Sequence, residues 1–422
     1  MLGDSMIKKI KEVCEVNPEQ IPGNTHLHHK ILYIDIESVE NGKIKGVKEF
    51  EFRHAPSRAR RVVKEGDTIF STVRPYLRAF AFIKHEHDKK ICSTGFAVLR
   101  ANEKVSPAYL YQCMASNTIM KQTLPVMVGS NYPAINTSDL LEFRIYIPNL
   151  GEQQKIADIL SVVDRKIELT EQLIAKYEHI KEGMMQDLLT GKKCWKNGEW
   201  LESEGFQSVP FVGLITRDWF FDKLKNHAEI EYGISEALDR NVENGVRIIS
   251  LPNVDKDGNL HLEDVPKIER RKVRSRDLLE KGDILFNWRN GSIEHLGKCV
   301  YFDLDEKYTH VGFLLRVENT DSQLLNKFLY YWMYYLKRKG FFKNAKIQVN
   351  NTFNSTELGG IMIPIPPTVE EQRKIVESLD VINEKLNLLK NKLSNDKKIK
   401  EGLMQDLLTG KVRIPLYEPV NQ

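Results

Sequence analysis

The sequence predicts an α+β protein in which two mixed α/β domains are separated by two long helices that form an antiparallel coiled coil, giving a pseudo-two-fold internal repeat. Three observations lead to this prediction. A long helical segment occurs twice without a gap, each copy follows a domain-sized segment, and the two domain-sized segments show the same order of strand, turn and basic signals. At 422 residues the chain also exceeds what one hydrophobic core usually supports.

The helical repeat is found by shifting the sequence by 219 residues. This shift lays residues 152–192 on residues 371–411 without a gap, and about half of the positions are identical. The ends match best, because IKEGMMQDLLTGK at 180–192 differs from the second copy only by Met184 in place of Leu403. Internal duplication is the simplest explanation of such a match.

Apolar residues in both copies recur at alternating steps of four and three residues, which is the heptad pattern of a coiled-coil seam. Each copy has two polar interruptions, Thr170 and Lys181 in the first and Asp396 and Lys400 in the second. A structural hairpin with no specific role would show the same pattern, but more than 170 residues separate the copies. The seam residues are Ile156, Leu160, Val163, Ile167, Ile174, Tyr177, Met184 and Leu188, and Ile375, Leu379, Ile382, Leu386, Leu389, Leu393, Leu403 and Leu407.

Start and stop signals of the helices also repeat. Residues 149–152 and 368–371 predict capping boxes just after a proline or a proline cluster. Glycine follows Leu-Leu-Thr at the C-terminal end of both copies, at Gly191 and Gly410, where a C-cap glycine is common. A second glycine lies inside each helix, at Gly183 and Gly402, where it costs about 1 kcal/mol relative to alanine, so we expect a bend or a break there.

The two domain-sized segments carry corresponding signals in the same order. Each has a strand-like run with a hairpin turn, at Asn41-Gly42 and at Asp257-Gly258, then further apolar strands, an aromatic helix and a proline-ended strand. The predicted layout is a first domain at 1–148, a helix at 149–192, a linker at 193–214, a second domain at 215–363, a second helix at 364–411 and a C-terminal tail at 412–422.

A basic stretch precedes a Gly-Asp pair in both domains, and arginines and lysines in such stretches suit contact with DNA phosphates. Nearby polar and aromatic side chains are of the types that bond to base edges or stack on bases. A charge run is, however, usually a solvated face, and the Tyr-rich segment 330–335 is typical of a core helix. The predicted DNA-binding residues are Arg58, Arg60, Arg61, Lys64, Thr72, Arg74, Tyr76, Arg78, Asn131, Tyr132, Arg271, Lys272, Arg274, Arg276, Trp288, Arg289, Asn290, Gln348, Asn350 and Asn351.

No catalytic constellation is found in the sequence. There is neither a GxxxxGK[ST] phosphate loop nor a GxGxxG turn for a nucleotide or methyl-donor cofactor. The one histidine cluster, His26, His28 and His29, lies in a polar stretch without nearby cysteines, and the five cysteines are widely spaced, so no metal site is predicted. We therefore predict a non-catalytic chain without a cofactor of its own.

Composition indicates a globular chain away from membranes. Hydrophobic residues make up 41% and charged residues 28%, the net charge is +4, and no signal peptide or spanning run is present. We expect a cytoplasmic protein. A net charge of +4 permits nucleic-acid binding without requiring it, because the basic and acidic residues nearly balance.

The order of domain, helix, domain and helix, with PxxxEQxKI and LLTGK each occurring twice, resembles the specificity subunit of type I restriction-modification systems over nearly the whole chain. The resemblance implies a DNA-reading subunit that binds double-stranded DNA, two methyltransferase subunits and motor-nuclease subunits. S-adenosylmethionine, ATP and Mg²⁺ would then belong to those partners. On this resemblance the predicted partner-docking residues are Glu152, Gln153, Gln186, Asp187 and Gly191, and Glu371, Gln372, Gln405, Asp406 and Gly410.

Helices of about 38 residues would span about 57 Å, which predicts a split, asymmetric DNA target with an unread gap. The main alternative is a coiled-coil scaffold or protein-interaction adaptor that does not bind DNA. A weaker alternative is a nuclease or methylase fragment that acts by itself.

Overall fold

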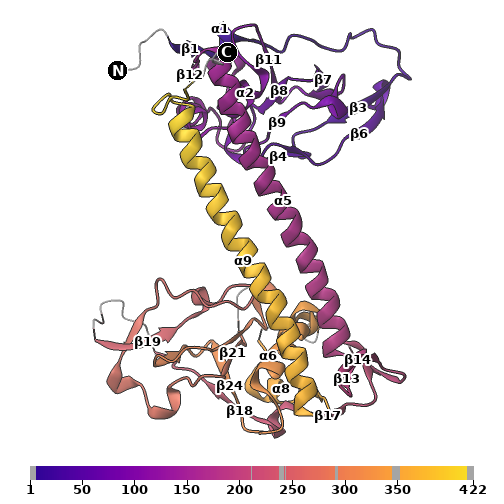
Figure 1. The fold of residues 1–422 in the computed structure, drawn as a ribbon, viewed down its shortest axis with the longest axis vertical. Coiled ribbons are helices and arrows are strands. Elements are labelled where there is room, and N and C mark those ends of the chain that lie inside the picture. The colour runs from indigo at the N-terminus through magenta and orange to yellow at the C-terminus, as the bar shows by residue number, and fades with distance from the viewer. Residues whose placement is uncertain are drawn as a thin grey trace, which may run out of the picture. The chain divides into compact units, whose positions relative to one another are not determined.

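A computed structural model of the chain describes residues 6–210, 212–236, 242, 244–289, 293–344 and 352–415. The chain forms two compact units: unit 1 consists of Met1–Gln172 and Lys390–Gln422, and unit 2 of Leu173–Leu389. Each unit holds one sheet-rich domain and a stretch of each of the two long helices, α5 (Leu150–Leu189) and α9 (Val369–Leu407) (Figure 1).

The domain of unit 1 begins at the N-terminus and leads into α5. Its helices are α1 (Ile10–Val13), α2 (Pro107–Met114), α3 (Asn117–Thr123) and α4 (Thr137–Leu141). Its strands are β1 (Ile7–Lys9), β2 (Cys14–Val16), β3 (Lys30–Ile34), β4 (Val39–Glu40), β5 (Lys43–Ile44), β6 (Lys48–Glu51), β7 (Ala59–Val62), β8 (Thr68–Ser71), β9 (Phe80–Phe82), β10 (Ile91–Ser93), β11 (Phe96–Ala101) and β12 (Arg144–Tyr146).

The domain of unit 2 lies between the two long helices in the sequence. Its helices are α6 (Asn326–Arg338), α7 (Phe341–Asn344) and α8 (Ser355–Gly359). Its strands are β13 (Lys193–Lys196), β14 (Glu199–Glu202), β15 (Phe206–Val209), β16 (Gly213–Thr216), β17 (Phe220–Lys223), β18 (Ala228–Tyr232), β19 (Gly245–Ile249), β20 (Lys267–Glu269), β21 (Ile284–Asn287), β22 (Cys299–Tyr301), β23 (Tyr308–His310), β24 (Leu314–Asn319) and β25 (Met362–Ile365).

The two domains share one sheet topology. The order β2-β11-β8-β9 in unit 1 corresponds to β18-β24-β21-β22 in unit 2, and a parallel strand pair flanked by an antiparallel strand occurs in both, as β6-β3-β10 and β20-β19-β23. The register also agrees, since the last residue of β8 pairs with the first of β11 and the last of β21 with the first of β24. Unit 1 adds β7 next to β10. The predicted fold class and internal repeat are confirmed.

The segment at 193–214, predicted as a linker, is built of two β-hairpins. Strand β13 pairs with β14 and β15 pairs with β16, all antiparallel. In the first hairpin the rings of Trp195 and Trp200 pack edge-on, with their centroids 5.3 Å apart. The described residues of this segment are therefore part of the fold of unit 2.

The helix ends join the cores of the domains. In unit 1, Ile156 and Leu160 from the start of α5 belong to one buried cluster with Tyr109 of α2 and with Leu407 from the end of α9. In unit 2 the equivalent cluster combines residues from the start of α9, the end of α5 and the aromatic helix α6. Each domain core therefore contains both copies of the repeat.

The helical stretches in unit 1 pair in an antiparallel manner, because higher residue numbers in α5 contact lower numbers in α9. Lys400 lies 2.5 Å from the Asp164 carboxylate, and Lys166 lies 2.6 Å from that of Asp396. Asp396 and Lys400 are the two polar interruptions of the heptad in the second copy. Each of them forms an ion pair with an oppositely charged residue of α5.

Neither long helix is interrupted at its internal glycine. Helix α5 continues through Gly183 and α9 through Gly402, so the predicted break is wrong. The cost of one glycine is about 1 kcal/mol, and the packed seam outweighs it. Only one of the two hydrogen bonds of each predicted capping box forms. Asn149 and Thr368 accept hydrogen bonds from the backbone N–H groups of Glu152 and Glu371, at 3.0 and 3.2 Å, but the glutamate carboxylates do not bond back to the cap residues.

Both predicted hairpin turns are present, and their glycines are needed for two reasons. Gly42 and Gly258 adopt positive φ values of +85° and +83°, which side chains rarely tolerate. A Cβ atom at either position would also lie within 2.4 or 2.6 Å of a tyrosine hydroxyl, that of Tyr111 or of Tyr330. These tyrosines occupy equivalent positions in the two copies. The turn and the aromatic helix therefore pack in the same way in both domains.

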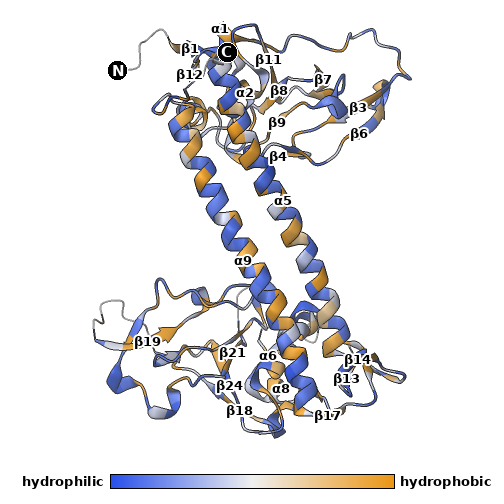
Figure 2. Cartoon of the chain, in the orientation of Figure 1, coloured by the Kyte–Doolittle hydropathy of each residue, from blue (hydrophilic) through white to orange (hydrophobic). Residues whose placement is uncertain are grey.

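No helix in the described part of the chain is long and apolar enough to cross a membrane. Along α5 and α9, apolar residues alternate with polar ones on the ribbon (Figure 2).

The Gly-Asp pairs give a testable difference between the domains. Asp67 forms a two-pronged ion pair with Arg100, at 2.9 and 2.8 Å, whereas Asp283 lies 3.8 Å from Arg316 and its burial raises the pKa from 3.8 to about 6. Below about pH 4 the Asp283 carboxyl group is neutral in both the folded and the unfolded state, and its contribution to stability is fully present. This contribution is lost as the pH rises through 6, where the buried group ionises.

We therefore expect Asp283→Asn to stabilise unit 2 at pH 7.5 by about 1–3 kcal/mol, with the gain vanishing near pH 4. Asp67→Asn should instead destabilise unit 1 at pH 7.5, because it breaks the ion pair with Arg100. Denaturant unfolding of both variants between pH 4 and 8 measures this, and a gain for Asp283→Asn that is independent of pH would contradict the titration of this carboxyl group.

Candidate nucleic-acid interface

Four loops of unit 1 meet at one edge of the domain. Backbone hydrogen bonds join them: Thr94 N–H donates to Arg58 O at 2.8 Å, Thr72 N–H to Gly95 O at 2.8 Å, and Arg74 N–H to Pro133 O at 2.7 Å. The segments joined are those before β7, after β8, before β11 and between α3 and α4. Loops on a rigid sheet are a common place for binding residues.

Arg74 and Tyr132 are in direct contact on this surface. The Arg74 guanidinium carbon lies 4.3 Å from the centroid of the Tyr132 ring, and Arg74 Nη2 donates to Asn131 O at 2.9 Å. Tyr132 is 70% exposed and Tyr76 45% exposed. The structure thus brings together four of the predicted site residues: Arg74, Tyr76, Asn131 and Tyr132.

Two other predicted residues do not reach this surface. Thr72 is buried, and its hydroxyl donates to Gly95 O at 2.9 Å, so its role is to hold two loops together. Arg78 turns toward α3, where its guanidinium donates to Asn117 Oδ1. The burial of Thr72 contradicts its predicted DNA contact, whereas Arg78 is half-buried and its DNA contact stays a prediction.

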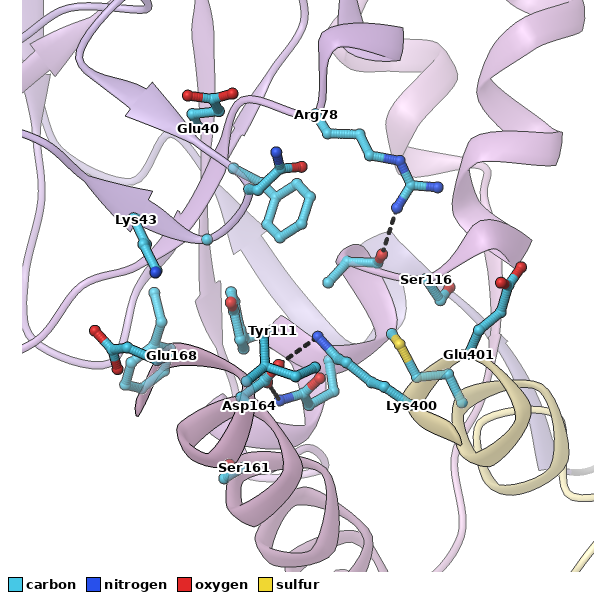
Figure 3. A pocket seen from close by; sticks show the side chains of 18 of the residues that line it. Glu40, Lys43, Arg78, Tyr111, Ser116, Ser161, Asp164, Glu168, Lys400 and Glu401 are labelled. Atoms are coloured by element: carbon cyan, nitrogen blue, oxygen red, sulfur yellow. Dashed lines mark hydrogen bonds and ion pairs between the residues drawn. The ribbon is translucent and has the colours of Figure 1, made fainter. Parts of the chain in front are cut away.

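Arg78 instead lines a groove of about 1600 Å³ between the domain of unit 1 and its helical stretches. In Figure 3, Tyr111 of α2, Asp164 of α5 and Lys400 and Glu401 of α9 surround this groove. Lys43 of the β4–β5 hairpin lies 2.9 Å from Glu171 of α5. Glu171 also lies 3.0 Å from Lys397 of α9. One ion pair at this groove therefore fastens the domain to α5, and the other links α5 to α9.

The corresponding loops of unit 2 are built on the same plan with different side chains. Trp288 directly follows β21, as Thr72 follows β8, and its indole N–H donates to Gly312 O at 2.6 Å while Tyr232 packs edge-on against it at 5.2 Å. Arg289 is exposed, and its backbone forms an isolated antiparallel β-bridge with that of Thr352. The remaining predicted residues of this domain, Asn290, Gln348, Asn350 and Asn351, lie outside the described residues.

The basic stretches differ in how many of their charges are already paired. In unit 2, Arg271 pairs with Glu269, Lys272 with Glu236 at 3.1 Å, and Arg274 with Asp277 at 2.8 Å. In unit 1, Lys64 pairs with Glu19 at 2.5 Å, and Arg60 stacks over Phe52 at 5.1 Å. Within these two stretches, Arg58 and Arg276 are exposed and form no ion pair with the described residues.

Arg61 is turned inward. Its Nε and Nη1 atoms are buried without a hydrogen-bond partner in the described part of the chain, and burial lowers its pKa. A phosphate cannot reach these atoms in this conformation. The residue is only half-buried and Nη2 is not one of these atoms, so a phosphate contact of Arg61 stays a prediction.

The free and paired arginines give a matched test of phosphate contact. Arg276→Ala should weaken binding to all DNA sequences alike and lower the slope of log K against log salt by about one unit. Arg274→Ala, two residues away, should change the slope less, because Asp277 already neutralises that charge. Fluorescence anisotropy with unrelated duplexes at several salt concentrations measures both, and a loss confined to one DNA sequence would contradict the phosphate role.

The Glu-Gln pair at the start of each long helix serves the fold. Gln153 is 0% exposed: it accepts a hydrogen bond from Ser106 N–H at 2.8 Å and donates to Lys104 O at 3.1 Å and Pro148 O at 2.8 Å. Gln372 repeats two of these bonds, from Leu325 N–H at 2.8 Å and to Gln323 O at 2.9 Å. Each glutamine therefore ties its helix to the segment before the domain's aromatic helix.

The two glutamates are buried as well, and each receives the chain that follows the other copy of the repeat. Glu152 binds Arg413 through two bonds at 2.9 and 2.8 Å and accepts Ile414 N–H at 3.1 Å. Glu371 accepts Trp195 N–H and Trp219 Nε1–H, each at 3.3 Å. The hydrogen bond with Arg413 lowers the pKa of Glu152, whereas burial raises the pKa of Glu371.

Buried side chains with internal partners offer no surface to another subunit. For Glu152, Gln153, Glu371 and Gln372 the structure therefore contradicts the predicted docking role, and the repeated contacts explain why both copies keep these residues. Gly191 and Gly410 have positive φ values of +64° and +71° and end the helices. Gln186, Asp187, Gln405 and Asp406 lie at least partly at the surface, and their docking role stays a prediction.

A second apolar pattern was not recognised in the sequence. Three exposed apolar residues of α5 have exposed apolar counterparts in α9 at a distance of 219 residues: Val162 and Val381, Leu169 and Leu388, and Ile180 and Ile399. Steps of seven and eleven residues return to the same side of a helix after about two and three turns. We call these six residues the outer stripe. Comparing the two copies outside the heptad seam would have revealed it.

The outer stripe is divided equally between the two units. Unit 1 contains Val162, Leu169 and Ile399, and unit 2 contains their counterparts Val381, Leu388 and Ile180. Val162 and Val381 are 69% and 68% exposed. Isolated exposed apolar residues are common, but here the same positions are exposed and apolar in both copies of the repeat.

No group of histidine, cysteine, aspartate or glutamate side chains in the described ranges is arranged to hold a metal ion.

Comparison with known proteins identifies the family. The model of the type I restriction modification DNA specificity domain matches residues 3–179 and 272–396. The chain is 28% identical over 337 residues to the specificity subunit of the type I restriction enzyme MjaVIII of Methanocaldococcus jannaschii, covering 77% of this chain and 74% of the relative.

Solved structures agree with this. One chain from a structure describing complex assembly and conformational transition of a type I restriction-modification system has 25% identity and a TM-score of 0.57, covering 96% of this chain and 98% of the other. The S subunit of a type I system from M. genitalium shares the fold at 14% identity and a TM-score of 0.61, covering 97% and 98% of the two chains. The chain belongs to the type I restriction-modification DNA specificity family.

Proposed function

We propose that this chain is the non-catalytic, DNA-reading specificity subunit of a type I restriction-modification complex. The observation that carries the proposal is the loop surface built on one backbone plan in both units, with polar and aromatic side chains such as Arg74 and Tyr132 in unit 1 and Trp288 and Arg289 in unit 2. Because the two surfaces share a backbone plan but differ in side chains, they would read different base sequences. The target is therefore bipartite and asymmetric.

The proposed partners follow from the outer stripe. Two equivalent apolar sets, one on each unit, suit two copies of one partner, and on the family relationship that partner is the methyltransferase subunit. S-adenosylmethionine would bind to the methyltransferase subunits, and ATP and Mg²⁺ to motor-nuclease subunits that join for restriction.

The decisive experiment expresses the chain with the methyltransferase encoded beside it, in a host that lacks adenine methylation, and maps methylated adenines by single-molecule sequencing. Methylation at one bipartite motif, only when both chains are present, supports the proposal. Methylation by this chain alone would favour an enzyme. Absence of methylation, together with a stable complex of the two proteins, would favour a scaffold that does not read DNA.

The length of the helices gives a further prediction. Helix α5 has 40 residues and α9 has 39, so each is about 60 Å long. Inserting one heptad into both helices at matched positions adds about 10 Å to each, and we expect the unread gap of the motif to grow by about three base pairs while both half-sites stay the same. An unchanged gap would show that the helices do not set the spacing.

A further inference from the structure

The segment of unit 1 that follows β8 and carries Arg74 is held by more backbone contacts than a contact with phosphate requires. Val73 forms an antiparallel β-bridge with Ala134, and Arg74 N–H donates to Pro133 O at 2.7 Å, so the loop between α3 and α4 holds the backbone at Val73 and Arg74. Arg74 itself adopts a left-handed conformation with φ of +47°, which non-glycine residues rarely adopt. Its position is therefore set by tertiary contacts.

The side chain is also held in one orientation. The Tyr132 ring stacks under the guanidinium, and the bond from Nη2 to Asn131 O fixes the rotation of the planar group. The Nε atom is buried. Of the five N–H donors of the guanidinium, the two on Nη1 and one on Nη2 have no partner among the described residues, and Nη1 and Nη2 are neighbouring nitrogens of one planar group.

Such an oriented pair of donors matches one base. Guanine presents two acceptors, O6 and N7, side by side in the major groove, and a two-pronged arginine contact to them is the commonest base-specific contact in protein–DNA complexes. Adenine offers a donor in place of O6, and the pyrimidines offer no such acceptor pair. A phosphate would accept the same donors, but it needs no fixed orientation, and the exposed arginines Arg58 and Arg276 are better placed for it.

We infer that Arg74, oriented by Tyr132, reads one guanine in the half-site bound by unit 1. The inference rests on the proposed function, because it names the base that one of its two reading surfaces selects. Arg74 makes the base contact, and Tyr132 is a positioning residue whose exposed ring supports the guanidinium.

The test compares methylation motifs of complexes that contain wild-type chain, Arg74→Lys or Arg74→Ala, each expressed with the methyltransferase. Wild type should show a guanine, on either strand, in one half-site. Both variants should make that single position degenerate, with the preference for guanine falling by about 5- to 150-fold in competition assays, while the other half-site is unchanged. Arg74→Lys retains the charge, so its affinity for unrelated DNA and the salt slope should stay at the wild-type values.

The remaining outcomes separate the inference from the proposed function. An unchanged motif in both variants, or an equal loss at every position with a lower salt slope, would overturn the guanine contact while leaving the specificity role intact. A wild-type complex that directs no methylation would overturn both. Tyr132→Ala should relax the same position less than Arg74→Ala, and Tyr132→Phe should retain the preference, because phenylalanine keeps the ring face. Equal thermal unfolding of all four variants and wild type shows that the changes are not due to misfolding.

Discussion

Replacing Val162 with glutamate is expected to remove one of the two methyltransferase subunits from the complex, and replacing Val162 and Val381 together is expected to remove both. Both valines are about two-thirds exposed in the chain alone and would be covered by the partner. A carboxylate buried in an apolar interface without a cation costs about 3 kcal/mol or more, which weakens binding more than 100-fold. Native mass spectrometry of the co-expressed complex measures the stoichiometry directly.

Gln172→Glu is the matched control for this experiment. Gln172 is exposed on the same helix, about 80° around from the outer stripe, and the substitution introduces the same charge. It should leave two partner subunits bound. The free chain should keep its thermal stability in all variants, since surface substitutions usually change it by less than about 0.5 kcal/mol. Two bound subunits in the Val162→Glu/Val381→Glu variant would place the docking surface elsewhere.

Gln153→Ala is expected to destabilise unit 1 by about 3 kcal/mol. The substitution leaves three backbone groups, Ser106 N–H, Lys104 O and Pro148 O, without the partner that Gln153 provides. Each such loss costs about 1 kcal/mol or more in a buried setting. Hydrogen exchange followed by mass spectrometry should show faster exchange around Ser106 and the start of α5, with unit 2 unaffected.

The neighbouring residue and the repeat supply controls for this prediction. Gln154 is exposed, so Gln154→Ala should change exchange little. Gln372→Ala should have the corresponding effect in the other unit. It should loosen the segment around Leu325 in unit 2 and leave unit 1 as it is. If both glutamine variants loosened both units equally, the glutamines would not act as local anchors.

The buried Glu-Gln pairs also show why similarity between the copies was a poor guide to docking. Both copies keep these residues, and the resemblance to a known family implied that they bind a partner. The structure shows that they bind the chain's own backbone and, for Glu152, Arg413 from the segment after the second helix. Two residues separated by 261 positions meet here, and no local pattern predicts such a contact.

The candidate DNA surface was predicted in part. Residue types pointed to Arg74, Tyr76, Asn131 and Tyr132, and the fold brings these four together. The same reasoning also chose Thr72, Arg61 and Arg78, of which Thr72 is buried, Arg61 is half-buried and Arg78 is bound to Asn117 of α3. Which arginine of a basic stretch faces solvent depends on strand orientation and on packing with other loops, and a list of residue types does not contain that information.

The sequence by itself determined the internal repeat, the two long helices with their heptad seam, the cap positions and the matched hairpin turns. These features depend on periodicity and on local backbone preferences, which can be read over a few residues at a time. Only the tertiary structure decided that Gly183 and Gly402 leave the helices uninterrupted, that the Glu-Gln pairs are internal anchors, and that Arg74 stacks on Tyr132. Those outcomes depend on contacts between segments far apart in the sequence, whose packing energy exceeds local preferences of about 1 kcal/mol.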